Sequence, residues 1–447
     1  DAGPRGGQGL FVLGPYQGQL SARGETVQVR DALGAMAGTY SYTGAPSAAQ
    51  QFLRITEIMF HPAATLGSPL DPDAFEYLEL ANISETVTLD LTGVRLVNGI
   101  EFDFTGSAVS SLVPGARVLV VKNAAAFVAR YGTGRPVAGQ FTGNLNNAGE
   151  RIQLLDASNE EILDFSYDDD WHPLVDGLGF SLVLADPTAP PEAWNGSSQW
   201  RPSSAPSGSP GLADPPPPVI AGVLITEALT RNDAPPPPDT IELHNPTEQP
   251  AEVGGWWLTD DFNTPAKFRI PNGTSIAPLD YLTFDATQFG AGDAGFGLGA
   301  DGDEVWLFSA DAAGQLTGYV HGHRFGAADD GVSFGLHVTS DGQEHFVAQS
   351  APTLGTANAG PQVGPVVISE IMYHPSGGDD GTDCSGDEYI EIVNISAEVV
   401  PLFAADRPTN TWRVRGGVDF DFPTDLTLAG GEYILLVNFN PTNTALT

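Results

Sequence analysis

An eight-residue string occurs twice in this chain of 447 residues, as ITEIMFHP from Ile55 and as ISEIMYHP from Ile368. A weaker copy, ITEALTRN, begins at Ile225. Each copy precedes a second apolar string that ends in asparagine: EYLELAN at 76–82, TIELHN at 240–245 and EYIEIVN at 388–394. The same order of strings three times over predicts three related units that stack as repeats.

Later strings extend this order. A Phe-x-[Phe/Ile] element occurs in each unit, starting at Phe102, Phe268 and Phe420. A glycine-rich signature follows as GNLNNAGERIQLLD from Gly143 and as GLGADGDEVWLFSAD from Gly297. The third copy of this signature, GQLSARGETVQVRD, lies at the other end of the chain, in residues 18–31. We therefore expect the chain to begin with the second half of one unit and to end with the first half of another.

The local patterns predict strands. Short runs rich in Val, Ile, Leu, Phe and Tyr alternate with Gly, Pro, Asn and Asp, which is typical of β-sandwiches and barrels. The clearest runs are EYLEL at 76–80, RVLVV at 117–121, RIQLL at 151–155 and EYILLV at 432–437. Only NAAAFVARYG, residues 123–132, reads as a short helix. The proline-rich stretch 203–218 reads as a semi-rigid linker.

These ordered elements resemble the bacterial lamin-tail domain, an immunoglobulin-like β-sandwich that is repeated in secreted and cell-surface proteins. The resemblance rests on ITEIMFHP with EYLELAN, on GVRL at 93–96, on GNLNNAGERIQLLD, and on DGLGFSLVL with SGSPG. It implies an all-β chain of tandem immunoglobulin-like β-sandwich domains in a head-to-tail string. The family is a structural and accessory module, so the resemblance implies that the chain is not an enzyme.

The resemblance and the repeats together give a domain map. We expect a complete lamin-tail-like domain and a second, divergent one, separated by a proline-rich linker and flanked by two half-domains. Their expected ranges are 1–49 for the C-terminal half, 52–212 for the complete domain, 213–221 for the linker, 222–360 for the divergent domain and 365–447 for the N-terminal half.

Charge and composition limit the classes of molecule that this chain can bind. The chain has 56 acidic and 18 basic residues, a net charge of −38, and this field repels the phosphates of nucleic acids. The same field favours solubility, salt tolerance or the binding of hard cations. No run approaches the roughly 18 apolar residues of a membrane helix. The single cysteine, Cys384, excludes an intramolecular disulfide.

Two acidic loops are candidate calcium sites. One follows the first copy of the opening string and the other follows the third; their acidic residues are Asp71, Asp73, Asp379, Asp380, Asp383, Asp387 and Glu388. Flexible loops rich in carboxylate oxygens suit calcium, although the spacing does not fit the EF-hand pattern. A solvated acidic loop without an ion is the alternative. No other cofactor is expected.

Recurring charged residues in the strands favour structure over catalysis. Paired carboxylates can perform acid–base chemistry, but a pair that returns in every unit is better explained by capping backbone donors of a loop or by sharing an ion. These residues are Glu57, Glu227 and Glu370 in the first strand and Glu79, Glu242 and Glu391 in the second. His61 and His374 recur before proline, where we expect the ring to pack against the end of the strand.

A half-sandwich exposes an apolar face and unpaired strand edges. We therefore expect the last half-domain of one copy to be completed by the first half-domain of the next, either non-covalently or within a longer repetitive chain. The predicted function is a structural subunit of an extracellular filament or surface adhesin, with the chain itself as partner. The alternative is a non-catalytic, ligand-binding region of a large secreted enzyme.

Calcium binding by the acidic loops is testable. If both loops bind the ion, millimolar calcium raises the melting temperature of the chain by mass action, and Asp380→Asn reduces that rise. Thermal unfolding with and without calcium measures the effect. Equal melting temperatures would leave a solvated acidic surface as the explanation.

Overall fold

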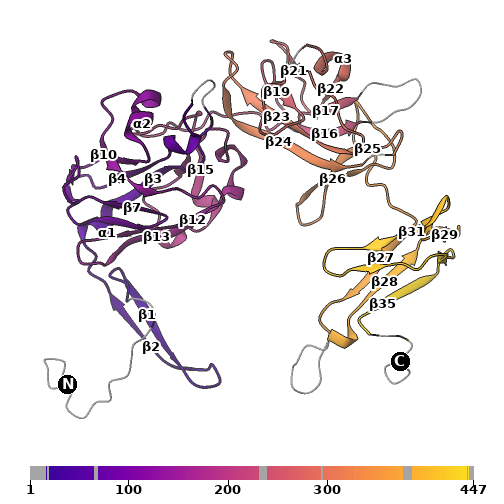
Figure 1. The fold of residues 1–447 in the computed structure, drawn as a ribbon, viewed down its shortest axis with the longest axis horizontal. Coiled ribbons are helices and arrows are strands. Elements are labelled where there is room, and N and C mark those ends of the chain that lie inside the picture. The colour runs from indigo at the N-terminus through magenta and orange to yellow at the C-terminus, as the bar shows by residue number, and fades with distance from the viewer. Residues whose placement is uncertain are drawn as a thin grey trace. The chain divides into compact units, whose positions relative to one another are not determined.

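A computed structural model describes residues 17, 20–64, 69–230, 239–292, 295–327, 329–375, 385–439 and 441 (Figure 1). The described chain is all-β, with a few short helices among many strands. It forms two compact units, Asp1–Ile225 with Thr240–Arg324, and Thr226–Asp239 with Phe325–Thr447. The repeats below are named by their predicted ranges: the first repeat is 52–212, the second 222–360 and the third 365–447.

The first repeat has two main sheets. Its six-stranded sheet runs in the order β10-β9-β4-β3-β14-β15, and its five-stranded sheet in the order β11-β7-β6-β12-β13. The first sheet consists of β3 (Leu53–Met59), β4 (Tyr77–Asn82), β9 (Arg117–Val121), β10 (Val137–Gln140), β14 (Leu182–Leu184) and β15 (Trp200–Pro202). The second consists of β6 (Arg95–Asn98), β7 (Ile100–Asp103), β11 (Thr142–Gly143), β12 (Glu150–Leu155) and β13 (Glu161–Tyr167), while β5 (Leu89–Asp90) pairs with β8 (Ser111–Leu112).

The core of the first repeat lies between these sheets. Apolar side chains from both sheets belong to one buried cluster, including Ile55, Leu80, Leu96, Ile152 and Leu154. The other face of the six-stranded sheet is covered as well, because Phe127 of α2 (Ala124–Tyr131) packs with buried residues of β3, β4 and β9. All seven residues of β3 are therefore buried, the polar residues Arg54, Thr56 and Glu57 included.

The second repeat has a five-stranded sheet in the order β22-β17-β16-β25-β26 and a four-stranded sheet in the order β20-β19-β23-β24. The strands of the first are β16 (Leu224–Leu229), β17 (Thr240–His244), β22 (Tyr281–Asp285), β25 (Ser333–Val338) and β26 (Glu344–Ala348). Those of the second are β19 (Trp257–Thr259), β20 (Phe268–Arg269), β23 (Gly302–Ala310) and β24 (Leu316–Gly326), and β18 (Ala251–Glu252) pairs with β21 (Ser275–Ile276).

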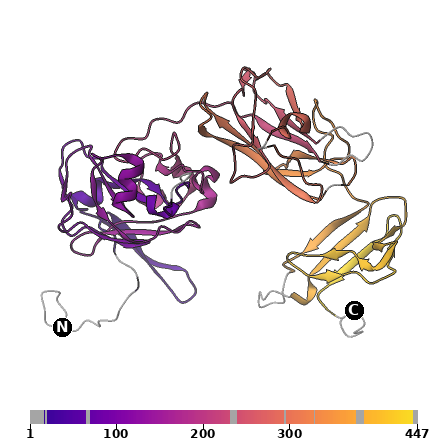
Figure 2. The same cartoon turned by 45° about the horizontal axis from the view of Figure 1, so that its top comes forward.

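The third repeat has a three-stranded sheet in the order β27-β28-β35 (Figure 2). These strands are β27 (Val366–Met372), β28 (Tyr389–Asn394) and β35 (Tyr433–Val437). Three small ladders accompany the sheet, namely β29 (Val400–Pro401) with β34 (Thr427–Leu428), β30 (Phe403–Ala404) with β31 (Arg407–Thr411), and β32 (Arg413–Val414) with β33 (Phe420–Asp421). Its first two strands pair in the register of β3 and β4, with the irregularity at the matching position.

Near the N-terminus, β1 (Gly24–Arg30) and β2 (Met36–Thr43) form a two-stranded hairpin. This hairpin reproduces β12 and β13 of the first repeat without a gap, from Gly24 matched with Gly149 to Tyr42 matched with Tyr167. Both glycines have positive φ, 85° and 86°. Each hairpin also has a register shift at the end of its first strand.

Side-chain contacts confirm the match of the two hairpins. The Tyr42 hydroxyl donates to a carboxylate oxygen of Glu25 at 3.0 Å, and the Tyr167 hydroxyl donates to Glu150 at 3.2 Å. Each tyrosine also contacts a backbone carbonyl just before its hairpin, at 2.9 Å in both cases. Residues 24–43 therefore have the structure of the hairpin β12–β13 of the first repeat.

The predicted strands 76–80, 117–121, 151–155 and 432–437 are confirmed as β4, β9, β12 and β35, and the predicted helix is α2. The prediction that 123–132 is the only helix was wrong, because α1 (Ala48–Phe52) and α3 (Ala286–Phe289) also form. Each begins with a capping box, in which Ser47 or Asp285 exchanges hydrogen bonds with a glutamine three residues later. Such short helices have too few residues to show an apolar period.

Candidate interaction site

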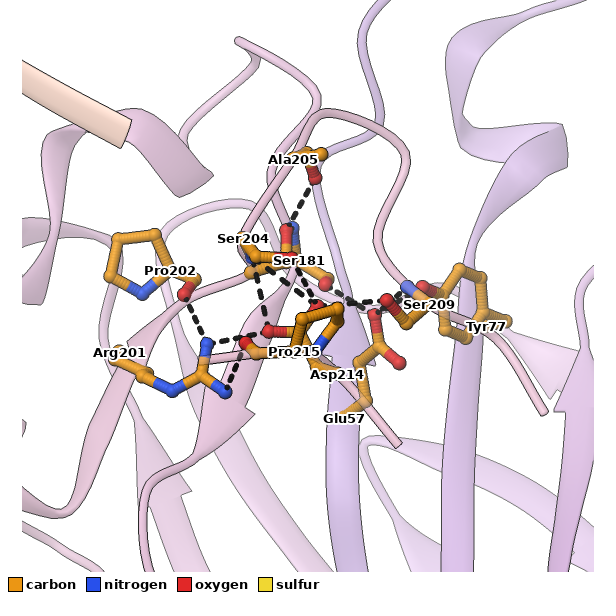
Figure 3. Close-up of polar contacts among 11 residues, drawn as sticks. Glu57, Tyr77, Ser181, Arg201, Pro202, Ser204, Ala205, Ser209, Asp214 and Pro215 are labelled. Carbon is orange, nitrogen blue, oxygen red and sulfur yellow. Dashed lines mark hydrogen bonds and ion pairs between the residues drawn. The ribbon is translucent and has the colours of Figure 1, made fainter. Parts of the chain in front are cut away.

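A buried carboxylate lies in the first strand of the first repeat. Glu57, in β3, is 1% exposed. One of its oxygens accepts hydrogen bonds from the Tyr77 hydroxyl at 2.6 Å, from the Ser209 backbone N–H at 2.8 Å and from the Ser181 hydroxyl (Figure 3). Tyr77 belongs to the neighbouring strand β4, whereas the two serines follow more than 120 residues later in the chain.

The later residues belong to what we call the closing segment, residues 178–214 of the first repeat. Its strand β14 lies antiparallel to β3, with Leu182 opposite Ile58 and Val183 opposite Glu57. Its loop then passes directly over the carboxylate: a Cβ added to Gly208 would lie 2.1 Å from Oε1 of Glu57. The backbone of Gly208 also has positive φ, so glycine alone fits here.

A second carboxylate holds the same loop. Glu79, in β4, accepts hydrogen bonds from the Thr56 hydroxyl at 2.7 Å, from Nε of Arg117 at 3.0 Å and from the Gly211 backbone N–H at 2.7 Å. Backbone donors of the closing loop thus end on both recurring glutamates. The predicted role of these residues, capping the backbone donors of a loop, is confirmed in the first repeat.

Asp214 ends the closing segment. Its carboxylate pairs with Arg201 of β15 at 2.6 Å and accepts a hydrogen bond from the Ser209 hydroxyl at 2.8 Å. The Ser204 backbone N–H also donates to it, at 3.0 Å (Figure 3). The loop over Glu57 is therefore fixed at both of its ends.

Burial controls the charge of these carboxyl groups. It raises the pKa of Glu57 above its ordinary value, although the hydrogen bonds from Ser181, Tyr77 and Ser209 act against this rise. Burial also raises the pKa of Glu79 to about 7 and that of Glu76 to about 8. Glu76 accepts a hydrogen bond from the backbone N–H of Leu145 at 3.0 Å, so it also joins distant parts of the repeat.

The second repeat repeats this arrangement with other residues. Glu227, in β16, is fully buried and accepts hydrogen bonds from the backbone N–H and the hydroxyl of Thr353, each at 2.9 Å. Strand β25 lies antiparallel to β16 with Gly335 opposite Glu227, as β14 lies against β3. The residue that matches Ser181 is Ser333, which is also fully buried.

In the third repeat, half of this site is present. Glu370, in β27, is exposed and accepts a hydrogen bond from the Tyr389 hydroxyl at 2.6 Å, the distance found between Tyr77 and Glu57. The Ser369 hydroxyl donates to Glu391 at 2.7 Å, as Thr56 does to Glu79. Among the described residues of the third repeat, no segment occupies the place of a closing segment.

An apolar groove adjoins this half-site. It has a volume of about 590 Å³ and is lined by residues of β27, β28, β32, β33 and β35, among them Ile368, Ile371, Ile390, Val414 and Phe420. Ile368 and Ile371 are more than half exposed. The residues that match them in the first repeat are buried in the core between its sheets, at Ile55 and Ile58. The groove is therefore an uncovered inner face.

The recurring asparagines Asn82, Asn245 and Asn394 have a structural role. All three are buried. Each amide nitrogen donates to a backbone carbonyl across the following turn and to another 30 to 34 residues later in the chain. Each amide oxygen accepts from the backbone N–H two residues later. Asn82 and Asn394 begin glycosylation acceptor patterns, but their buried amide nitrogens leave no room for a glycan in the folded chain.

The structure describes four of the seven predicted calcium ligands, and one of them, Glu388, lines the groove of the third repeat. Asp71 caps a 3₁₀-helix by accepting from the backbone N–H of Asp73 at 3.1 Å. Asp387 is exposed and Glu388 is half-buried. The remaining candidates lie outside the described residues, as does Cys384: Asp379, Asp380 and Asp383. Calcium binding therefore stays a prediction.

The predicted packing of the recurring histidines takes a specific form. The ring of His61 contacts the carboxylate of Asp176, just before the closing segment, and lies against Gly177. His374, its match in the third repeat, is exposed. The first strand of a complete repeat thus contacts the region of its closing segment through a histidine as well as through a glutamate.

Comparison with protein families identifies the first and second repeats. The model of the Lamin Tail Domain matches residues 46–169 and 216–323, which is more than half of the chain. This chain belongs to the lamin tail domain family. No curated protein and no solved structure matches it.

Lamin tail domains are immunoglobulin-like, non-catalytic structural domains, and the two matched segments indicate tandem domains. The glutamate site of this lamin tail chain is accordingly a structural contact. The donors Ser181, Ser209 and Thr353 were missed by sequence reasoning, since SGSPG and APTLG share little beyond glycine. No described helix of the chain is long and apolar enough to cross a membrane.

The raised pKa values predict how the stability of the first repeat depends on pH. Glu76 and Glu79 keep their protons to about pH 8 and about pH 7 in the folded state, whereas the unfolded chain loses them near the ordinary value of 4.5. Stability therefore falls as pH rises through this range, by ~1.4 kcal/mol per pH unit for each proton that only the folded state retains. Urea-dependent hydrogen exchange of the amides in β4 and β9, recorded at several pH values, measures this change in the free energy of unfolding.

The variant Glu76→Gln keeps an acceptor for Leu145 and removes one titration, so its stability declines less steeply with pH. Glu85→Gln changes an exposed glutamate of the same repeat and is the matched control. Equal pH slopes for the wild-type chain and Glu76→Gln would contradict the assignment.

Proposed function

We propose that this chain is a structural module that assembles head to tail: the hairpin β1–β2 of one copy completes the third repeat of the next copy. The proposal rests on one observation, that the chain carries both parts of an uncovered sandwich core. Such a module suits an extracellular filament or a surface adhesin of bacterial origin, and its high net negative charge suits an extracellular or cell-surface location.

The hairpin supplies the first part. Val27, Val29 and Tyr40 are 41%, 61% and 71% exposed. Their matches in β12 and β13 lie at 0–2% exposure in the core of the first repeat: Ile152, Leu154 and Phe165. Fully burying one such side chain stabilises a fold by roughly 1.5–3 kcal/mol, so three of them give a substantial driving force for association.

The third repeat supplies the second part. Its ladder β32–β33 has the register of β6–β7, with Val414 opposite Phe420 as Leu96 lies opposite Phe102. In the first repeat, β6 pairs with β7 along one edge and with β12 along the other, where Leu154 lies opposite Leu96. In the third repeat this second edge belongs to β32. Transferring this register to the proposed joint places Val29 of one copy opposite Val414 of the next.

The contact joins two different surfaces of the same chain. A heterologous contact of this kind, when it does not close into a ring, builds an open filament. The added strand also covers an exposed sheet edge, which is the logic of strand complementation.

A second candidate function is an accessory, ligand-binding region of a larger secreted enzyme. The aromatic residues that line the groove of the third repeat, Tyr373, Tyr389 and Phe420, favour it. The two functions differ in what fills the groove: a second copy of the chain, or a ligand of another kind.

Disulfide trapping between two chains tests the assembly. In a Cys384→Ser background, one chain carries Val29→Cys and the other carries Val414→Cys. Directly opposite residues of paired strands lie within reach of a disulfide, so mixing and mild oxidation should yield a crosslinked heterodimer. Mass spectrometry of disulfide-linked peptides identifies the joined pair.

The matched control replaces Val414→Cys by Val399→Cys, which is 61% exposed in the same repeat but outside the proposed register. We expect little crosslinking to it. Equal crosslinking of Val29→Cys to Val414→Cys and to Val399→Cys would contradict head-to-tail completion. So would an internal disulfide in a dilute chain that carries both Val29→Cys and Val414→Cys.

A further inference from the structure

One of the two lysines of this chain lies beside an asparagine side chain. Lys122 directly follows β9, and Asn144 directly follows β11. The Nζ atom of Lys122 donates hydrogen bonds to the side-chain oxygen Oδ1 of Asn144 and to the backbone carbonyl of Gly143. Because Oδ1 is bonded to Cγ, the amide carbon of Asn144 is at most about 1.2 Å farther from Nζ than Oδ1 is. An amine and an amide carbon therefore lie within reach of each other.

A buried carboxyl group adjoins this pair. Glu76 directly precedes β4, and its backbone carbonyl accepts a hydrogen bond from the Lys122 backbone N–H at 3.0 Å, so the two residues are cross-strand neighbours. Its Oε2 atom accepts a hydrogen bond at 3.0 Å from the backbone N–H of Leu145, the residue after Asn144. Its Oε1 atom is buried and accepts no hydrogen bond from any residue that the structure describes. One carboxyl oxygen thus holds the loop of Asn144, and the other is available to a side chain there.

The surroundings keep this carboxyl group protonated near neutral pH. Burial raises the pKa of Glu76 to about 8, although the hydrogen bond from Leu145 and the positive charge of Lys122 act against the rise. A protonated carboxyl group can donate a hydrogen bond to an amide, which prepares the amide carbon for attack by an amine. The centre of the buried Phe141 ring lies 5.8 Å from Nζ of Lys122, so one side of the amine faces an apolar surface.

We propose that Lys122 and Asn144 form an isopeptide bond, a covalent amide between the two side chains, with Glu76 as the proton donor. The ammonium group of Lys122 first releases a proton to solvent, and the neutral Nζ attacks Cγ of Asn144. Glu76 gives its proton to the leaving amide nitrogen and takes one from Nζ, so it ends protonated again. One C–N bond forms, another breaks and ammonia leaves, so the step needs no oxidant, reductant or cofactor.

Folding supplies the proximity that this reaction requires. Holding an amine and an amide carbon in one geometry raises their effective concentration by several orders of magnitude over free groups in water. The bond joins the two sheets of the first repeat, because β9 belongs to the six-stranded sheet and β11 to the five-stranded sheet. It forms within one repeat of one chain, so it does not depend on assembly between copies.

The reaction is confined to the first repeat. The register of the paired strands places Ala286 of the second repeat and Asn438 of the third at the position of Lys122. The other lysine of the chain, Lys267, pairs with Asp260 at 2.6 Å. We therefore expect one such bond in each chain.

Intact mass spectrometry of the full chain under denaturing conditions tests the bond. The expected mass is below the sequence mass by one molecule of ammonia. Protease digestion should then yield a branched peptide in which Lys122 is joined to Asn144, as identified by tandem mass spectrometry. The full sequence mass, or a loss of ammonia without the branched peptide, would overturn the proposal.

Two lysine substitutions assign the lost ammonia. Lys122→Arg keeps the positive charge but supplies no amine that can be deprotonated for the attack, so the full sequence mass should return. Lys267→Arg makes the same change at the other lysine and should keep the loss of ammonia. A loss of ammonia from the Lys122→Arg chain would overturn the assignment.

The rate of bond formation measures the role of Glu76. Glu76→Gln keeps an acceptor for Leu145 but carries no acidic proton, so the loss of ammonia should become about a hundredfold slower or more. The two chains are made by cell-free synthesis and sampled over time, and circular dichroism establishes that the variant is folded. Bond formation at the wild-type rate in the folded variant would overturn the role assigned to Glu76.

Discussion

The fold of this chain depends on the burial of one apolar layer between two sheets. In the first repeat, side chains from both sheets share that layer, and the six-stranded sheet is buried on its outer face too. A sheet that lacks its opposite layer keeps large apolar side chains in water, at a cost of roughly 1.5–3 kcal/mol each. The third repeat and the N-terminal hairpin are both in this state, and their exposed residues match core positions of the first repeat.

The recurring glutamates show how a repeat fixes its last strand. A carboxyl group in a buried strand is costly unless it is hydrogen-bonded. Glu57 and Glu227 obtain their bonds from a loop that arrives more than 120 residues later, so the core is complete only when the closing segment is in register. A misplaced closing segment would leave a buried carboxyl group without donors. The main effect of the glutamate is therefore to destabilise wrong registers of the closing segment.

Much of the fold could be predicted from the sequence because residues that recur at matching positions of the repeats mark the strands and the residues with a structural role. The strands β4, β9, β12 and β35, helix α2 and the capping role of Glu57 follow from local patterns and from their recurrence. The donors to the glutamates do not, because Ser209 and Thr353 lie in loops with different sequences and contribute backbone groups. The cap that Asp71 forms on a 3₁₀-helix is likewise not visible in the sequence, because the acidic composition of its loop does not show which backbone donor the carboxylate meets.

Hydrogen–deuterium exchange of the full chain at low and high protein concentration tests the central claim, that the hairpin of one copy completes the third repeat of another. The account predicts that protection of β1–β2 and of β32–β33 increases together as concentration rises, because the two elements form one sheet across the joint. Exchange in these strands that is independent of concentration, while the chain remains folded, would contradict it.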